Sequence, residues 1–290
     1  MGLRLKFNLV LIGVFAVGLA ACATISYRLL QDNAQGEVER NAQLMMETAL
    51  AIRSYTVNQV KPQLDSVLAD RFLPQTVPAY AATETLSELR KNHPEYAYKE
   101  ATLNPTNPRN RASDWETDLV SSFRASPATT ELKGVRDTPT GRHMYIARPI
   151  RISNAACLAC HSSPANAPVT MVKLYGAANG FGWKHNEIVG AQVVSVPMAV
   201  PIENADRAFT TFMLSLLGVF LFVMLALNLM LEWLIIRPVA QMSQAADRVS
   251  TGDFTVPEFR DGGRDEVSIL GASFNRMRRS LETAMRMIDS

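Results

Sequence analysis

The chain has 290 residues, enough for one or two packed domains, and a formal net charge of +2. This near-neutral balance gives no support for a nucleic-acid groove or a polyacidic substrate. Charged residues make up 19% and hydrophobic residues 48%, which indicates that part of the chain lies in lipid. Three cysteines are too few for a disulfide framework, so the compartment must be inferred from the topology.

Two uncharged runs predict membrane-spanning helices, the first from Phe7 to Tyr27 and the second from Ala208 to Leu231. At about 1.5 Å per residue, each run crosses a hydrocarbon layer of about 30 Å. Arg4 and Lys6 precede the first run, so the positive-inside bias predicts a cytoplasmic N-terminus. We predict a bacterial inner-membrane protein with five segments: cytoplasmic 1–7, membrane 8–27, periplasmic 28–207, membrane 208–236 and cytoplasmic 237–290.

The first run contains "LAAC", which ends at Cys22 and fits a bacterial lipoprotein cleavage site. The alternative is an uncleaved signal-anchor helix, which we favour because the apolar run continues past Cys22 into a helical pattern. Both alternatives export the region that follows.

The exported region predicts a mixture of helices and strands. The first helix continues from the membrane to about Pro74 and Pro78, because apolar residues recur on one face at Val38, Ala42, Met45, Ala49 and Ile52. Further helices are expected at about 79–92 and 115–123. Strands are expected at 96–104, 142–153 and 187–198, with an Asn/Pro loop over 104–114 and a loop rich in Pro, Ala and Gly after the cysteines. This layout predicts an α+β fold and is that of an extracytoplasmic PAS-like sensor domain.

After Pro238 the chain predicts two short heptad helices, separated by a linker that contains Gly252 and Pro257. The apolar heptad positions are Val239, Met242, Ala246 and Val249, then Val267, Leu270, Phe274, Met277, Leu281, Ala284 and Ile288. "IIRPV", "GDF" and "DEVSILGASFNRM" resemble a HAMP domain. The resemblance implies a parallel four-helix coiled coil made by two chains, hence a homodimer. The alternative is an amphipathic tail that lies on the membrane.

Residues 157–163 read "CLACHSS", and C-x-x-C-H is the signature of covalent haem attachment. The thiols of Cys157 and Cys160 would add to the haem vinyl groups, while His161 binds the iron. A zinc site would need a second ligand pair, and a thioredoxin-type dithiol would open a helix, whereas Pro164 and Pro168 follow. A disulfide would leave His161 without a role. We therefore predict one covalently attached haem c, the other three readings being the alternatives.

The sixth iron ligand is unknown at this stage, and an open position would admit a gas. The candidates are His93, His143, His185, Met45, Met46, Met144 and Met171. Cys22 is an unsuitable ligand because it lies in the membrane segment. Haem propionates favour arginine forks, for which the candidates are Arg109, Arg111, Arg148 and Arg151, unless these simply face solvent. Trp183 and Tyr145 are candidates for the haem wall or for ordinary core.

From about Met46 to Pro201 the chain resembles a family of extracytoplasmic monohaem c-type, PAS-like domains. The matching stretches are "AIRSYT" with "PQL", "EYAYKEATLNPTNPRN", "RPIRIS.AACLACH", "GFGW" and "IVGAQVVSVP". The resemblance implies a redox- or ligand-responsive haem domain, often coupled through a HAMP domain to a signalling output. It carries Cys157, Cys160 and His161 over as haem-binding residues and identifies no distal ligand.

The given sequence stops at Ser290, without a kinase, cyclase or methyl-accepting region after the second HAMP helix. We expect either a separate cytoplasmic partner or a shortened receptor whose HAMP domain mainly dimerises it. The predicted function is a membrane-bound haem c sensor that is not an enzyme. The alternative is a membrane-anchored electron-transfer cytochrome. A third reading, reduction of peroxide or nitrogen oxides, needs an acid–base residue that nothing in the sequence marks.

Overall fold

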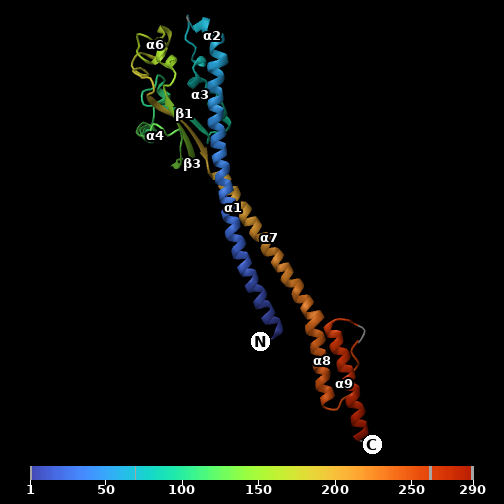
Figure 1. The fold of residues 1–290 in the computed structure, drawn as a ribbon. Helices are drawn as coiled ribbons and strands as arrows, with labels where there is room; N and C mark the ends of the chain where they lie inside the picture. Colours follow the sequence, from blue (N-terminus) through green and yellow to red (C-terminus); the bar gives the residue numbers. More distant parts are fainter. Residues whose placement is uncertain (1, 69, 261–262, 289–290) are drawn as a thin grey trace. The chain divides into compact units, whose positions relative to one another are not determined.

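The computed structural model describes residues 2–68, 70–260 and 263–288. Its chain divides into two compact units, Tyr27–Phe209 and the remaining described residues. Figure 1 shows the elements of both units. All four strands belong to the unit Tyr27–Phe209.

The first helix, α1 (Leu3–Tyr55), continues through a π-helical turn, η1 (Thr56–Val60), into α2 (Lys61–Leu68). An 18-residue window of this helix has a mean hydropathy of 2.4 and no buried residue, so it is long and apolar enough to cross a membrane. The expected first membrane helix and its outward continuation are therefore confirmed, although α2 ends at Leu68 rather than near Pro74.

The second such helix runs through α7 (Ala199–Leu231), η5 (Glu232–Ile236) and α8 (Arg237–Ser250), and its apolar window has a mean hydropathy of 2.5. In η5 the Arg237 amide donates to the carbonyl of Glu232, five residues back, and Pro238 follows directly. Proline has no N–H to donate and crowds the preceding turn, so the wider π-turn keeps the helix continuous. Pro238 thus lies in the first turn of α8, as expected, but no break separates α8 from the membrane helix.

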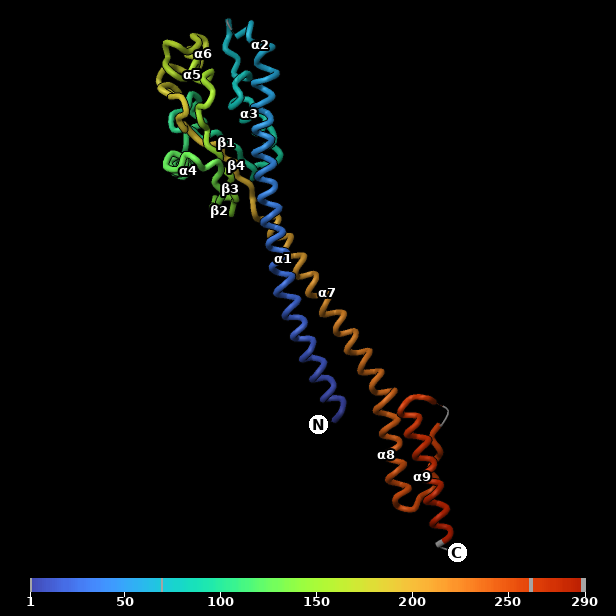
Figure 2. Tube along the Cα trace, viewed as in Figure 1, coloured from blue at the N-terminus to red at the C-terminus, as the bar shows by residue number. Residues whose placement is uncertain are grey.

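The four strands form one antiparallel sheet in the order β1-β4-β3-β2. They are β1 (Ala97–Thr102), β2 (Leu132–Thr138), β3 (Gly141–Arg151) and β4 (Ile188–Pro197). Figure 2 shows β4 between β1 and β3. Since strand residues alternate between the two faces, β4 supplies buried side chains to both sides of the sheet.

One face of the sheet packs against α1 and α3 (Pro78–Asn92). The buried apolar residues between this face and the two helices come from α1, α3 and the sheet with the residue that follows β4. They are Val38, Ala42, Met45, Met46, Ala49, Ala82, Leu86, Ile146, Val194, Val196 and Met198. The expected apolar stripe of α1 is therefore a true core stripe.

The other face packs against α4 (Asp114–Ala125). Its buried residues are Leu119, Val120, Phe123, Ala147, Ile188, Ala191 and Val193. A capping box fixes the start of α4, since Glu116 accepts from the Ser113 amide at 2.8 Å while Ser113 caps the helix. Lys99 also pairs with Glu116 at 2.7 Å on this face.

The mixed helix and sheet fold predicted from the sequence is confirmed, as are the helices at about 79–92 and 115–123 and three of the strands. The sequence did not predict β2, an edge strand whose alternate residues are exposed. It also did not predict two short helices in the loop region, α5 (Leu158–His161) and α6 (Val169–Tyr175).

In the second unit, the membrane helices meet through Phe15 and Phe220, whose rings stack at 3.5 Å, and through a reciprocal amide pair. Asn8 donates to Asn228 at 3.0 Å and accepts from it at 2.8 Å. Amides that satisfy each other in this way stabilise helix association in a bilayer.

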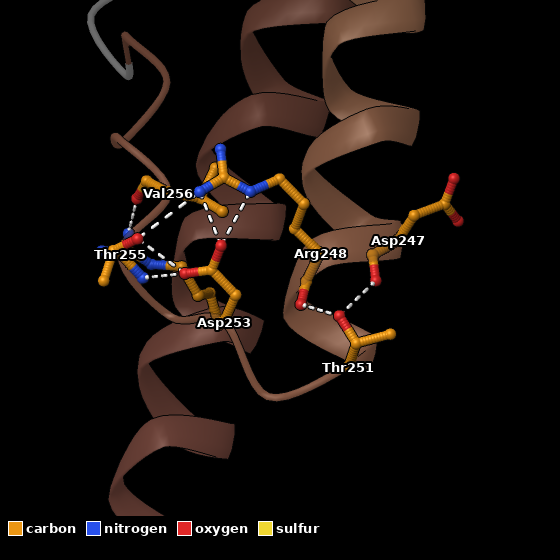
Figure 3. Close-up of polar contacts among 7 residues, drawn as sticks. Asp247, Arg248, Thr251, Asp253, Thr255 and Val256 are labelled. Atoms are coloured by element: carbon orange, nitrogen blue, oxygen red, sulfur yellow. Dashed lines mark hydrogen bonds and ion pairs between the residues drawn. The ribbon is translucent and has the colours of Figure 1, made fainter.

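The two expected heptad helices are α8 and α9 (Glu266–Ile288), which pack around Ala245, Val249, Val256 and Phe274. The side chain of Ile288, an expected heptad residue, lies outside the described residues. Figure 3 shows how the connector begins: Arg248 donates twice to Asp253, at 2.8 and 2.6 Å, and the Thr255 hydroxyl donates to the same carboxylate at 2.6 Å. Asp253 therefore ties the end of α8 to the connector.

Candidate functional site

The end of β3 brings the cysteines to one end of the sheet, where α5 and α6 lie (Figure 2). A register shift at Ile150 and Arg151 bends the strand out of the ladder. Asn154 then caps a 3₁₀ turn, η4 (Ala155–Cys157), by accepting from the Ala156 amide at 2.9 Å. This turn leads directly into α5.

Cys157, Cys160 and His161 lie within one short helical stretch. Residues three and four apart in a helix share one face, so all three side chains project to the same side. Both cysteines are free thiols and half-buried. Pro164 and Pro168 argue against a long helix here, but the single turn of α5 is complete before the first proline.

The ring of His161 is held by two other loops. Its Nδ1 lies 2.7 Å from the carbonyl oxygen of Gly180 and 3.5 Å from the hydroxyl of Thr106. Its plane stacks on Trp183, with ring centroids 3.9 Å apart and 12° between the planes. Because a carbonyl only accepts, Nδ1 carries the proton and Nε2 keeps a free lone pair.

Burial lowers the pKa of His161, and the hydrogen bond to Gly180 only partly opposes this effect. The imidazole is therefore neutral at neutral pH, which is the form that binds a metal. A carbonyl partner on the second nitrogen is the usual way in which a protein orients a histidine ligand.

Gly180 must be a glycine at this corner. Its φ is +86°, and an added Cβ would lie 2.0 Å from the Thr106 hydroxyl. Asn104 accepts from the Gly180 amide and donates to the Phe181 carbonyl, both at 3.1 Å. The Asn/Pro loop after β1 and the "GFGW" loop before β4 are thus interlocked around His161.

Arg53 near the end of α1 and Lys61, the first residue of α2, act electrostatically on the two thiols. Arg53 interacts electrostatically with Cys157, and Lys61 with Cys160. Burial raises the pKa of the Cys160 thiol, an effect that Lys61 opposes and Cys157 reinforces. Neither cation was identified from the sequence, although Arg53 and the buried Thr56 extend the apolar stripe of α1 at helical spacing.

The donor set fits a c-type haem. Two half-buried thiols one turn apart suit thioether attachment, and a neutral imidazole with a free Nε2 suits an axial ligand. Among the residues that the structure describes, no three His, Cys, Asp or Glu side chains gather as a protein-only metal site requires.

The structure gives most sixth-ligand candidates another role. Met45 and Met46 are buried in the core between α1 and the sheet, and Met144 packs against it. His143 is buried, with Nδ1 3.0 Å from both the Thr138 hydroxyl and the Gly141 carbonyl, and Nε2 3.2 Å from the Glu95 carbonyl. His93 and His185 are exposed, and Met171 is buried on α6.

The arginines suggested for propionates are also engaged. Arg148 pairs with Glu47 and Glu131, and Arg109 pairs with Glu84. Arg151 donates to the carbonyl of Pro127 at 2.6 Å, and Arg111 donates to Asn179 at 3.5 Å.

The two aromatic candidates differ. Trp183 stands against His161, whereas Tyr145 packs on the α4 face against Trp115, with ring centroids 5.5 Å apart.

Two family models match the chain: Tll0287-like over residues 31–197 and HAMP domain over residues 230–283. The heme sensor protein HssS from Staphylococcus aureus strains JH9, Newman and JH1 is 35% identical over 88 residues. That match covers 30% of this chain and 19% of the relative, so the chain spans about a fifth of the length of these curated relatives. The crystal structure of the cyanobacterial heme-protein Tll0287 aligns with 17% identity and a TM-score of 0.43, covering 56% of this chain and 95% of that one.

Proposed function

The chain belongs to the Tll0287-like family, and on this premise we propose that it is a membrane-bound haem c sensor that signals through its HAMP domain. The observation that carries the proposal is the His161 imidazole, whose Nδ1 is held by Gly180 while Nε2 stays free beside two thiols. The curated relative HssS is named a heme sensor protein, which supports the same cofactor.

We propose that Cys157 and Cys160 form thioethers to one haem and that His161 Nε2 is its axial ligand. When bound, the haem supplies an iron that exchanges one electron between its ferric and ferrous states. The protein holds the histidine through Gly180, Thr106 and Trp183. We propose a sensory role, in which the chain catalyses no reaction of its own.

The proposed topology places residues 28–207 in the periplasm and residues 1–7 and 237–290 in the cytoplasm, with the spans at 8–27 and 208–236. Arg4 and Lys6 support the cytoplasmic side of the N-terminus. Covalent haem attachment takes place outside the cytoplasmic membrane, which agrees with this orientation.

We propose that the HAMP domain is a homodimer, with a separate cytoplasmic partner receiving the signal. Phe274 is buried between α8 and α9 of one chain. Leu270, Met277 and Leu281 share its heptad yet are 51%, 49% and 45% exposed. A second copy that covers this seam would complete a four-helix coiled coil.

In this account the oxidation state at the haem biases the HAMP helices between two packings. We would place Met277→Cys in full-length Cys22→Ser protein and crosslink it in the membrane with a bismaleimide, after oxidation with ferricyanide or reduction with ascorbate. The crosslinked fraction should differ between the two states. Thr283→Cys, which is exposed and lies on the side of α9 away from the heptad seam, should crosslink weakly in both.

Equal crosslinking of Met277→Cys in both states, in a chain whose haem is attached and reducible, would contradict the signalling proposal. That result would favour an electron carrier. The Cys157→Ala/Cys160→Ala chain provides the remaining control, since its crosslinking should not respond to oxidants.

A further inference from the structure

A buried polar network joins α1 to the sheet beside the candidate haem site. Arg53 Nη1 contacts both carboxylate oxygens of Glu100, at 2.5 and 2.6 Å. Tyr98 donates to Glu100 at 2.8 Å, and Gln192 donates to the Tyr98 hydroxyl at 3.4 Å. The network therefore links α1, β1 and β4.

The network holds one positive and one negative charge away from water. The side chains of Glu100 and Arg53 are 3% and 25% exposed. Burial is the largest single effect on the pKa of Arg53 and lowers it, but the charge of Glu100, the charge of Tyr98 and the hydrogen bond to Glu100 together raise that pKa. Burial and the charge of Glu100 also raise the pKa of Tyr98 well above its usual range, so Tyr98 stays neutral and donates. Arg53 thus keeps its positive charge over the physiological pH range.

The ion pair of Arg53 and Glu100 is connected to the candidate haem site through few residues. Arg53 contacts Glu100 directly, and the charge of Cys157 makes only a minor contribution to the raised pKa of Arg53. Glu100 lies on β1, which ends at Thr102 and continues into the loop whose Thr106 contacts His161. A change of charge at the iron would therefore act on both ends of one ion pair.

We propose that Arg53 and Glu100 are positioning residues that couple the oxidation state of the haem to α1. This inference rests on the proposed function. Reduction adds one electron to Fe(III) from a one-electron donor, and no bond or proton changes at Arg53 or Glu100. Reduction weakens the repulsion between the iron and Arg53 and also weakens the attraction between the iron and Glu100. These two changes alter the ion pair that ties α1 to β1. Charge effects of this kind are strong where little water screens them.

The test is the midpoint potential of the haem in full-length protein, measured by optical redox titration. Glu100→Gln leaves Arg53 uncompensated and should favour the ferrous form by about tenfold, which is about 59 mV for a one-electron couple. Arg53→Gln leaves Glu100 uncompensated and should shift the equilibrium by a similar factor in the opposite direction. The double variant Arg53→Gln/Glu100→Gln should return close to the parent value.

Glu116→Gln is the matched control. It breaks the Lys99 pair on the opposite face of the sheet and should shift the equilibrium by much less than Glu100→Gln. Arg53→Lys keeps the charge and should stay near the parent, which provides a variant if Arg53→Gln fails to fold. If both single-charge variants shifted the potential in the same direction, the pair would only support the pocket and the inference would be wrong.

The coupling of the oxidation state to α1 is tested by amide hydrogen exchange of residues 49–55, measured in the oxidised and in the reduced protein. The parent should show a difference between the states, and the double variant should lose it. An unchanged difference in the double variant would overturn the coupling to α1. Absence of haem from the parent protein would instead contradict the proposed function, so the two failures are distinguishable.

Discussion

The unit Tyr27–Phe209 and the HAMP helices bury their apolar side chains in different ways. Tyr27–Phe209 covers both faces of its sheet with helices of the same chain. The pair α8 and α9 buries a small cluster around Phe274 and leaves Leu270, Met277 and Leu281 exposed. The first region has a core of its own, whereas the second leaves heptad side chains exposed that the proposed homodimer would cover. We therefore expect a signal to arise in the unit Tyr27–Phe209, whose core is complete, and to change the packing of the HAMP helices, whose core is not.

The largest expected effect comes from breaking the self-sufficient core. Phe123 is fully buried between α4 and the sheet. Phe123→Ala should cost about 3–5 kcal/mol of unfolding free energy, since it removes a large side chain and leaves a cavity. Urea unfolding of the full chain in detergent, followed by haem absorbance, would measure the loss. A cost below about 1 kcal/mol would show that this core is not what holds the unit together.

The next effect tests the incomplete region. Leu270→Asp should abolish dimer formation, because a carboxylate without a partner in a coiled-coil seam costs about 3 kcal/mol or more. Haem content should not change. Analytical ultracentrifugation in detergent would report the dissociation, with Thr283→Asp as a control on the exposed side of α9, away from the heptad seam. A dimer that survives Leu270→Asp would place the contact between copies elsewhere.

A smaller effect is expected inside a single pair of HAMP helices. Asn275 is buried and holds the connector by accepting from the Phe259 amide at 3.0 Å and donating to its carbonyl at 2.7 Å. Asn275→Ala leaves both backbone groups unpaired and should cost about 1–3 kcal/mol. Thermal unfolding of the purified chain would detect it. An unchanged midpoint would mean that water replaces the side chain.

The smallest effect concerns acid stability at the end of α8. The Thr255 hydroxyl, then Arg248 and the Thr255 amide, lower the pKa of Asp253 from 3.8 to about 2. A carboxylate with a lowered pKa stabilises the fold above about pH 4, and this contribution is lost as the pH falls towards 2. Asp253→Asn should therefore reduce the pH dependence of stability between pH 4 and pH 2, measured by circular dichroism. An identical dependence in both proteins would contradict the assignment.

Periodic features were predictable because they follow from one helix or strand at a time. The apolar stripe of α1 and the heptads of α8 and α9 are visible in the spacing alone, and the C-x-x-C-H signature is local. The edge strand β2 lacks such a signal because Gly134 and alternate polar residues interrupt it.

The surroundings of His161 could not be predicted in the same way, since Thr106, Gly180 and Trp183 come from distant loops. Two of these loops contain short motifs seen in the sequence, but their contact is a product of the tertiary fold. Arg53 was predictable in principle, as a charged residue that continues a buried stripe and therefore needs a buried partner.

The central claim is tested most directly by locating the haem on the chain. Trypsin should release residues 152–173 as one peptide, because the nearest cleavage sites on either side of the cysteines follow Arg151 and Lys173. In protein made together with a c-type haem attachment system, mass spectrometry should find this peptide carrying one haem through Cys157 and Cys160, and Cys157→Ala/Cys160→Ala should carry none. Recovery of the parent peptide with two unmodified thiols would contradict the account.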